Sequence, residues 1–252
     1  MKYLLHLLLI SSYILHAHIV THHEFSDVLL YVSPDDYHPH TLVALDIDNT
    51  IGHHKCLIGS DQWVTACINK KVAQGMPYAQ ALSEVLVIYY AVQHVIDLIP
   101  VQEITPLIIK QLQDSGVTVV AITYRSLDIS DRTIAQLEAL GIDFSRSPIA
   151  IDITKNGEVT YLYKKGIIFC HGNNKGQILK KIFDLCNYKP SKVIAVDDKE
   201  HHLQSISQAL DSDTHFVGIR YAYLDEYVAQ FDEMLAQKEL DHFLIHGSLH
   251  SF

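Results

Sequence analysis

The segment Thr41–Ile51, which reads TLVALDIDNTI, constrains the fold of this chain more than any other. It is a short apolar run that ends abruptly in two aspartates, Asp46 and Asp48, spaced i, i+2. An apolar run of about five residues bounded by polar ones is typical of a parallel strand that is covered on both faces. The aspartates would then lie at the carboxyl end of the strand, where open α/β sheets bind their ligands.

A divalent cation accounts for two carboxylates at one strand end. Residues i and i+2 of a strand point to the same side, so Asp46 and Asp48 would repel each other without a positive charge between them. Mg²⁺ fits this setting best, because it is held by few protein oxygens and keeps several waters. We therefore predict a Mg²⁺ site at the end of this strand.

This segment resembles the first motif of the haloacid dehalogenase (HAD) superfamily, hhhhDxDxT, with Asp46, Asp48 and Thr50 at its three defined positions. The resemblance implies that Asp46 is a nucleophile that forms an aspartyl-phosphate and that Asp48 is a general acid/base. It also implies that the Asp46 side chain and the Asp48 backbone carbonyl are metal ligands.

The apolar run 117–122 ends at Thr123 and resembles the second HAD motif. The resemblance implies that the Thr123 hydroxyl bonds a phosphoryl oxygen. Family members often continue with a small residue and then arginine, whereas this chain has Tyr124 before Arg125. The bulky side chain puts in question how the loop approaches a substrate.

Two later segments resemble the third and fourth HAD motifs, in the order of the family. Lys175, within HGNNKG, is similar to the lysine that neutralises the nucleophile and the phosphate. The apolar run 192–196 ends in Asp197 and Asp198, which resembles the fourth motif in its DD form. The resemblance implies that Asp198 binds the metal directly and that Asp197 supports the site or binds through water, and which of the two is the direct ligand stays open.

Length and pattern predict one α/β domain with an insertion. A chain of 252 residues with 48% hydrophobic content can build a full core. We expect a Rossmann-like parallel sheet with helices on both faces, as in HAD proteins, from residues 18–51 and 101–252. Residues 52–100 carry no strong strand signal and look like a helical type-one cap, a lid over the pocket.

The cap region divides into two expected helices, Asp61–Gln74 and Pro77–Asp97, with Ser60 as a candidate N-cap. We expect flexible crossings to the core near Gly52–Gly59 and Leu98–Thr105. Aromatic side chains in the cap are read either as its own core or as substrate contacts; they are Trp63, Tyr89 and Tyr90.

Apolar periodicity and turn signals place the other elements. The expected helices are 106–115, 130–140, a helix beginning near Lys175, 199–210 and 223–240. The expected strands are 117–122, 166–170, 192–196, an edge strand at 215–219, and a hairpin of 149–154 with 159–163 around Lys155-Asn156-Gly157. Residues 18–40 show little periodicity and are expected to pack loosely.

The N-terminus, Met1–Ala17, has the plan of a secretory signal peptide: Lys2, an apolar core and a small residue at a possible cleavage site. We predict a bacterial exported protein, periplasmic or secreted, with no stable membrane span after cleavage. If the segment is not a signal, the protein is cytoplasmic. Export would permit disulfides, but the cysteines 56, 67, 170 and 186 lack a spacing that predicts pairing or a zinc site.

Charge excludes one class of partner. The formal charge of −10 disfavours nucleic-acid binding, which needs a basic surface. Three His-His pairs, at 22/23, 53/54 and 201/202, lack metal-ligand spacing and are read as solvated loop residues. The oligomeric state is not predicted.

The combined reading is a Mg²⁺-dependent phosphatase that hydrolyses a phosphate monoester through an aspartyl-phosphate on Asp46. A phosphorylated small molecule or phosphopeptide would be the substrate. The alternatives are a catalytically silent HAD-like exported binding or effector protein and a phosphomutase. A receiver domain also has a DD pair, an aspartate, a threonine and a lysine, but its DD comes first. More narrowly, VDDKEHHL and HGNNKG resemble a little-characterised HAD-like subgroup of intracellular bacterial pathogens.

Overall fold

The computed structural model describes residues 18–149 and 160–249, and within them the chain forms an α/β fold around a seven-stranded sheet. The strand order is β1-β9-β8-β2-β5-β7-β6, and every neighbouring pair is parallel except β7 with β6. The strands of this sheet are β1 (His18–His22), β2 (Thr41–Leu45), β5 (Thr118–Thr123), β6 (Leu162–Lys164), β7 (Ile167–Phe169), β8 (Lys192–Asp197) and β9 (His215–Tyr221). The expected α/β class with a mostly parallel sheet is confirmed.

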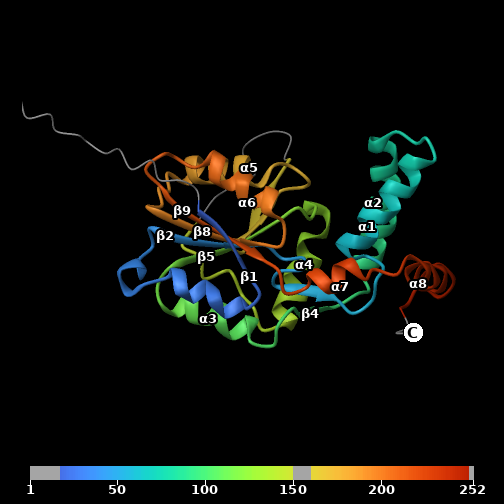
Figure 1. Ribbon diagram of the computed structural model, residues 1–252, viewed down its shortest axis with the longest axis horizontal. Coiled ribbons are helices and arrows are strands. Elements are labelled where there is room, and N and C mark those ends of the chain that lie inside the picture. Colours follow the sequence, from blue (N-terminus) through green and yellow to red (C-terminus); the bar gives the residue numbers. More distant parts are fainter. Residues whose placement is uncertain (1–17, 150–159, 250–252) are drawn as a thin grey trace, which may run out of the picture.

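Helices cover both faces of the sheet (Figure 1). On one face, α3 and α4 pack with the 3₁₀ segment η1; on the other, α5 packs beside α6. The α-helices are α1 (Asp61–Ala73), α2 (Tyr78–Gln93), α3 (Thr105–Asp114), α4 (Ser130–Ala139), α5 (Lys175–Cys186), α6 (Glu200–Ala209), α7 (Asp225–Ala229) and α8 (Glu233–His246). The 3₁₀ segments are η1 (Phe25–Tyr31), η2 (Pro34–Asp36) and η3 (Leu127–Ile129).

Strand β2 lies at the centre of the sheet, between β5 and β8, and every one of its residues is buried. Its apolar side chains are shared between the two hydrophobic layers: Val43 and Leu45 face one, and Leu42 and Ala44 the other. This burial on both faces explains why the run is continuous rather than alternating. The three parallel strands end at one edge of the sheet, which therefore carries Asp46, Thr123 and Asp197.

The helical pair α1–α2 projects from the core on a short ribbon (Figure 1). Ser60 caps α1, because its Oγ accepts a hydrogen bond from the Trp63 N–H at 3.2 Å, as predicted. The two segments that join this helical pair to the core were expected to be flexible, and strands were not predicted in them. Each contains a three-residue strand, β3 (Gly52–His54) in the first and β4 (Leu98–Pro100) in the second, and the two strands pair as an antiparallel two-stranded sheet. Strands of three residues are too short to show a period.

The segment 18–40 is better packed than its sequence indicates. β1 adds to the sheet outside β9, so the prediction of β9 as an edge strand was wrong. In η1, Phe25 and Val28 are 2% and 1% exposed and join the core. Loose packing was therefore also a wrong prediction.

The C-terminal region contains two helices instead of the single predicted one. α7 ends at Ala229, and Asp232 caps α8 by accepting hydrogen bonds from the N–H groups of Met234 and Leu235. A new N-cap inside a helical pattern ends one helix and starts the next. α8 continues to His246 and lies beside α1.

Two sequence-based predictions lie outside the described residues: the signal peptide Met1–Ala17, and the part of the proposed hairpin that falls in residues 150–159, which includes its turn and nearly all of its first strand. No helix in the described parts of the chain is both long enough and apolar enough to span a bilayer.

The start of α5 is held by a close approach of two backbones. A Cβ added to Gly176 would lie 1.9 Å from the carbonyl oxygen of Ser205 in α6. Only glycine permits this contact, which fixes the neighbouring Lys175 relative to the sheet.

We predict that Gly176→Ala separates α5 from α6 and lowers stability by about 1–3 kcal/mol, the usual cost of overpacking. Thermal unfolding measures it. Gln177→Ala is the matched control, since Gln177 is exposed on the same helix and should leave the midpoint nearly unchanged. Equal midpoints for Gly176→Ala and Gln177→Ala would contradict the contact.

Candidate functional site

A tight turn positions the residues that follow β2. The N–H groups of Thr50, Ile51 and Gly52 all point to the carbonyl oxygen of Ile47, at 3.0–3.3 Å. Asn49 has a φ of 61°, in the left-handed region that asparagine tolerates better than most residues. The Asp46 N–H donates to the carbonyl of Val196, which joins the turn to β8.

Three carboxylates converge at this edge of the sheet. One oxygen from each of Asp46, Asp197 and Asp198 lies within 4.8 Å of the others. Lys175, the first residue of α5, is 1% exposed and donates from Nζ to Asp46 Oδ1 at 2.5 Å and to Asp197 Oδ2 at 2.7 Å. The structure thus brings together four side chains that the sequence assigned to one site.

The two aspartates of the DD pair differ in their partners. Asp197 also accepts from the Lys199 N–H at 2.9 Å and contacts His202 Nδ1 at 3.0 Å. Among the described residues Asp198 makes no ion pair, and its one hydrogen bond is a long one from Asn49 Nδ2, at 3.4 Å. Asp198 therefore keeps more free lone pairs than Asp197 does.

The site holds an excess of negative charge. Burial raises the pKa of Asp46 well above its usual value, and the carboxylates of Asp197 and Asp198 add to the rise against the opposing effect of Lys175. Burial, followed by the charge of Asp197, also raises the pKa of Asp198 to about 7. A cation would remove this penalty. The converging donors are all carboxylate oxygens, with no His or Cys, so they suit a hard ion such as Mg²⁺ better than zinc.

Both motif threonines are buried. Thr123 Oγ1 accepts from the Arg125 N–H at 3.1 Å, so its own hydroxyl proton remains available to an incoming oxygen. Thr50 Oγ1 has no hydrogen-bond partner within residues 18–149 and 160–249. Thr123 thus presents a free hydroxyl donor at the end of β5.

Arg125 is a site residue whose role the sequence did not reveal. Its Nε and Nη2 donate to the two oxygens of Asp48, at 2.9 and 2.8 Å, and its Nη1 donates to Thr133 and Gln136 on α4. Burial opposes the ionised form of Asp48, but Arg125 outweighs it and lowers the pKa of Asp48 to about 2. Asp48 is therefore turned towards Arg125 as a carboxylate.

Tyr124, which replaces the small residue of the HAD pattern, has a structural role. Its ring meets the His202 ring edge to face, with centroids 4.4 Å apart, and lies 5.7 Å from Lys175 Nζ. An aromatic face near an ammonium group is attractive. The tyrosine thus covers the lysine from the side of the loop.

Two of the histidines read as solvated are buried, so that prediction was wrong for them. His202 is 4% exposed and His54 is 3% exposed. His202 contacts Asp197, and His54 Nε2 lies 3.2 Å from Gln93 Oε1. The only sequence signal for His202 was its place in the first turn of the helix that follows Asp197.

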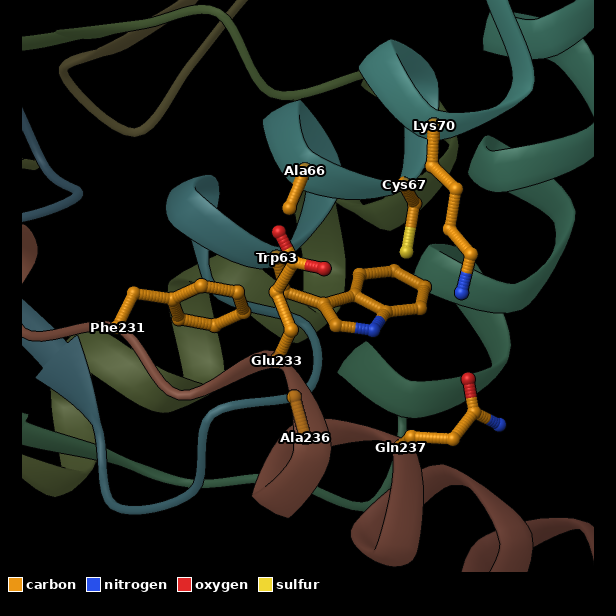
Figure 2. A pocket seen from close by; sticks show the side chains of 8 residues that line it. All are labelled: Trp63, Ala66, Cys67, Lys70, Phe231, Glu233, Ala236 and Gln237. Atoms are coloured by element: carbon orange, nitrogen blue, oxygen red, sulfur yellow. The ribbon is translucent and has the colours of Figure 1, made fainter. Parts of the chain in front are cut away.

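A cavity of about 410 Å³ lies between the α1–α2 pair and the loops after β5 and β7, and Asp48 and Arg125 are among the residues that line it. Trp63 is not among its lining residues. Figure 2 shows the Trp63 ring between α1 and α8, on the side of Phe231 and Ala236. Of the two readings of Trp63, the structure therefore favours packing.

The fold and the site define an α/β protein with a carboxylate–lysine centre at the ends of its parallel strands. The profile of the family described as "Protein of unknown function (DUF2608)" matches residues 21–246, so the chain belongs to that family. Similar proteins include one from Chlamydia pneumoniae, 23% identical over 90% of this chain and 84% of its own length. Another, from Chlamydia trachomatis, is 23% identical over 85% of this chain and 81% of its own length. Each bears the name "Putative outer membrane protein". No solved structure matches the chain.

We predict that Arg125→Met destabilises the protein by about 3 kcal/mol at neutral pH, because it leaves the Asp48 carboxylate without its partner. The folded-state pKa of Asp48 lies below its usual 3.8, so the pair stabilises the fold above about pH 4 and loses this effect as the pH falls towards 2. The difference in free energy of unfolding between wild type and Arg125→Met should therefore become smaller by roughly 1 kcal/mol from pH 6 to pH 3.

Urea unfolding at the two pH values measures this difference. Arg146→Met is the matched control, because Arg146 pairs with Asp114 at the surface and should contribute under about 1 kcal/mol. A difference for Arg125→Met that does not change with pH would contradict the pairing with Asp48.

Proposed function

We propose that this protein is a Mg²⁺-dependent phosphatase that hydrolyses a phosphate monoester through an aspartyl-phosphate on Asp46. The observation that carries the proposal is the position of Lys175, whose buried ammonium joins Asp46 to Asp197 beside the unpaired Asp198. Phosphoryl transfer requires positioning and charge neutralisation more than elaborate covalent chemistry. The Asp46 carboxylate, the Lys175 ammonium group and an acidic cluster that could hold a metal ion lie together at the strand ends, where they could position a phosphoryl group and neutralise its charge.

The side chains suggest a sequence of two displacements. A carboxylate oxygen of Asp46 attacks phosphorus, the P–O bond to the ester oxygen breaks, and that oxygen keeps the bonding electrons and takes a proton from Asp48 to leave as the alcohol. Water then gives a proton to Asp48 and attacks the same phosphorus, the bond between phosphorus and the Asp46 oxygen breaks, and inorganic phosphate is released. Lys175 offsets the charge on Asp46 and the phosphoryl group, while Thr123 donates to a phosphoryl oxygen. Mg²⁺ would supply further charge neutralisation, held by Asp46, Asp198 and the Asp48 carbonyl, with Asp197 in support.

The contact between Asp48 and Arg125 bears on the acid/base role. With both oxygens accepting from the guanidinium and its pKa lowered to about 2, Asp48 is a weak base in this arrangement. Giving a proton to the leaving oxygen in the first displacement, or taking one from water in the second, requires Asp48 to leave Arg125. We therefore propose Asp48 as the general acid/base and make both roles conditional on that movement.

The α1–α2 pair has the place of a HAD type-one cap in this proposal. It is inserted directly after the DxDxT turn, and its inner side faces the cavity that ends at Asp48. Lids of this kind exclude water and select substrates. The HAD-like assignment thus rests on the order of the four motifs, their strand ends and this insertion.

We predict that a generic ester such as 4-nitrophenyl phosphate is hydrolysed only with Mg²⁺, that EDTA abolishes the activity, and that Ca²⁺ inhibits through its larger, less regular shell. Asp46→Asn should lose the activity and the acid-stable trapped phospho-enzyme. Asp48→Asn should slow turnover by about 10²–10⁴-fold. Asp198→Asn should bind Mg²⁺ more weakly than wild type. Added Mg²⁺ should therefore raise the thermal unfolding midpoint of this variant less than that of wild type.

Asp213→Asn is the control for these variants, because it removes an exposed carboxylate outside the site. Activity that survives EDTA, or equal phospho-enzyme in Asp46→Asn and wild type, would overturn the proposal. No hydrolysis of any ester, with Mg²⁺ still raising the thermal midpoint, would favour the alternative of a silent exported binding or effector protein. Transfer of phosphate between sugar positions without release would indicate a phosphomutase.

We also propose that the protein is exported. The support is the plan of Met1–Ala17 together with the names of the Chlamydia relatives, which refer to the outer membrane. Cleavage after Ala17 would leave all of β1, which begins at His18, in the mature protein.

We predict that the full chain, produced in a bacterium with a general secretion system, is processed to an N-terminus near His18. Intact-mass spectrometry of the purified protein measures this directly. A variant with Lys2 and Leu8 replaced by glutamate should keep Met1, because it lacks the basic start and interrupts the apolar core. Wild-type protein that retains Met1 would contradict cleavage.

A further inference from the structure

The cavity beside Asp48 has walls that are mostly apolar. Helices α1 and α2 contribute aliphatic side chains, and aromatic rings come from α2 and from the loop after β5. These residues are Val64, Ile68, Leu82, Leu86, Tyr78, Tyr89, Tyr90 and Tyr124. A cavity of about 410 Å³ is in the usual range for a small-molecule site.

The charged side chains in the same walls, and Ser126, are already engaged. Asp61 forms an ion pair with Lys199. Arg125 is held by Asp48 and by two residues of α4, and Ser126 bonds Asp128 and contacts His171. These side chains offer little to a ligand that carries many hydroxyl groups.

Tyr89 is the most buried of the tyrosines that line the cavity. It is 8% exposed, and its hydroxyl has no hydrogen bond to any residue in the described ranges. Its ring meets that of Tyr90 edge to face, with centroids 5.7 Å apart. A buried tyrosine hydroxyl usually has a partner, so this one is available to a ligand. It therefore supplies a buried polar group in a wall that is otherwise mostly apolar.

We propose that the preferred substrate is a phosphate monoester whose alcohol part carries an aromatic ring, seated between Ile68, Leu86 and Tyr90, with at most one polar group near Tyr89. This inference rests on the proposed phosphatase function and names the substrate class of that site. Rings stack well against aromatic side chains in offset or edge-to-face arrangements. The phosphate would lie at the Asp48 end, where the cavity adjoins the strand edge.

The same walls disfavour other phosphate esters. A sugar phosphate would bury several hydroxyls against Leu82 and Leu86 without partners, and unpaired polar groups cost binding. A bisphosphate or nucleoside triphosphate would need a second cation. Arg125 is the only lysine or arginine among the described lining residues, and it is already paired.

The test compares four esters of primary alcohols, so that the intrinsic reactivity of the leaving group is similar: benzyl phosphate, hexyl phosphate, adenosine 5′-monophosphate and glucose 6-phosphate. With Mg²⁺, we expect kcat/KM for benzyl phosphate to be at least about 10-fold above that for glucose 6-phosphate and above the other two, since misfitted polar groups discriminate strongly. Tyr89→Phe should lower the ratio of kcat/KM for 3-hydroxybenzyl phosphate to that for benzyl phosphate several-fold.

Leu86→Gln should reduce the advantage of benzyl phosphate and leave inhibition by orthovanadate unchanged, because vanadate occupies only the phosphate position. Val87→Gln is the matched control, since Val87 is 68% exposed on the same helix and should keep the wild-type ratios. Thermal midpoints check that each variant is folded.

Equal kcat/KM for the four esters, or a preference for glucose 6-phosphate, would overturn the inference while the phosphatase function stands. No hydrolysis of any ester would overturn the function, and the inference with it.

Discussion

The ammonium group of Lys175, buried between Asp46 and Asp197, is the interaction on which the rest of the structure depends. Isolated buried charges are very costly, so these three groups are stable only when each is positioned to satisfy the others. The parallel strands β2 and β8 supply the two carboxylates from adjacent ends, and the start of α5 supplies the lysine. Gly176 then lets α5 approach α6 closely enough to hold that lysine in place.

The aspartates around this centre differ in the number and kind of their hydrogen-bond partners. Asp197 is fully engaged by Lys175, Lys199 and His202, whereas Asp198 is left with a single long hydrogen bond. Asp48 turns away from the acidic cluster towards Arg125. Carboxylates that are alike in sequence thus have different partners, and their pKa values are shifted in different directions.

The sequence allowed the central strands and the carboxylates at their ends to be predicted, because both depend on local signals, whereas Lys175 was assigned to the site only by its resemblance to the third HAD motif. A continuous apolar run marks β2, β5 and β8, and parallel strands end at one edge, so their terminal residues had to meet. The paired crossings β3 and β4, the added strand β1 and the Asp48–Arg125 pair depend on contacts between residues far apart in the chain. Such contacts leave no period in the sequence, and three-residue strands are shorter than any window that would detect them.

The attachment of α1–α2 to the core has a consequence for how a ligand is admitted. The carboxylate of Glu239 on α8 accepts the N–H groups of Leu57 and Ile58, while Arg132 on α4 donates to the carbonyls of Gln93 and Ile96. Together with the β3–β4 ribbon, these bonds make the base of the helical pair a braced stem rather than a hinge. The cavity wall is therefore largely formed before a ligand arrives, and little ordering entropy is lost on binding. A substitution of Glu239 in the remote helix α8 would consequently change the shape of the cavity, because it would tilt the stem that carries the wall.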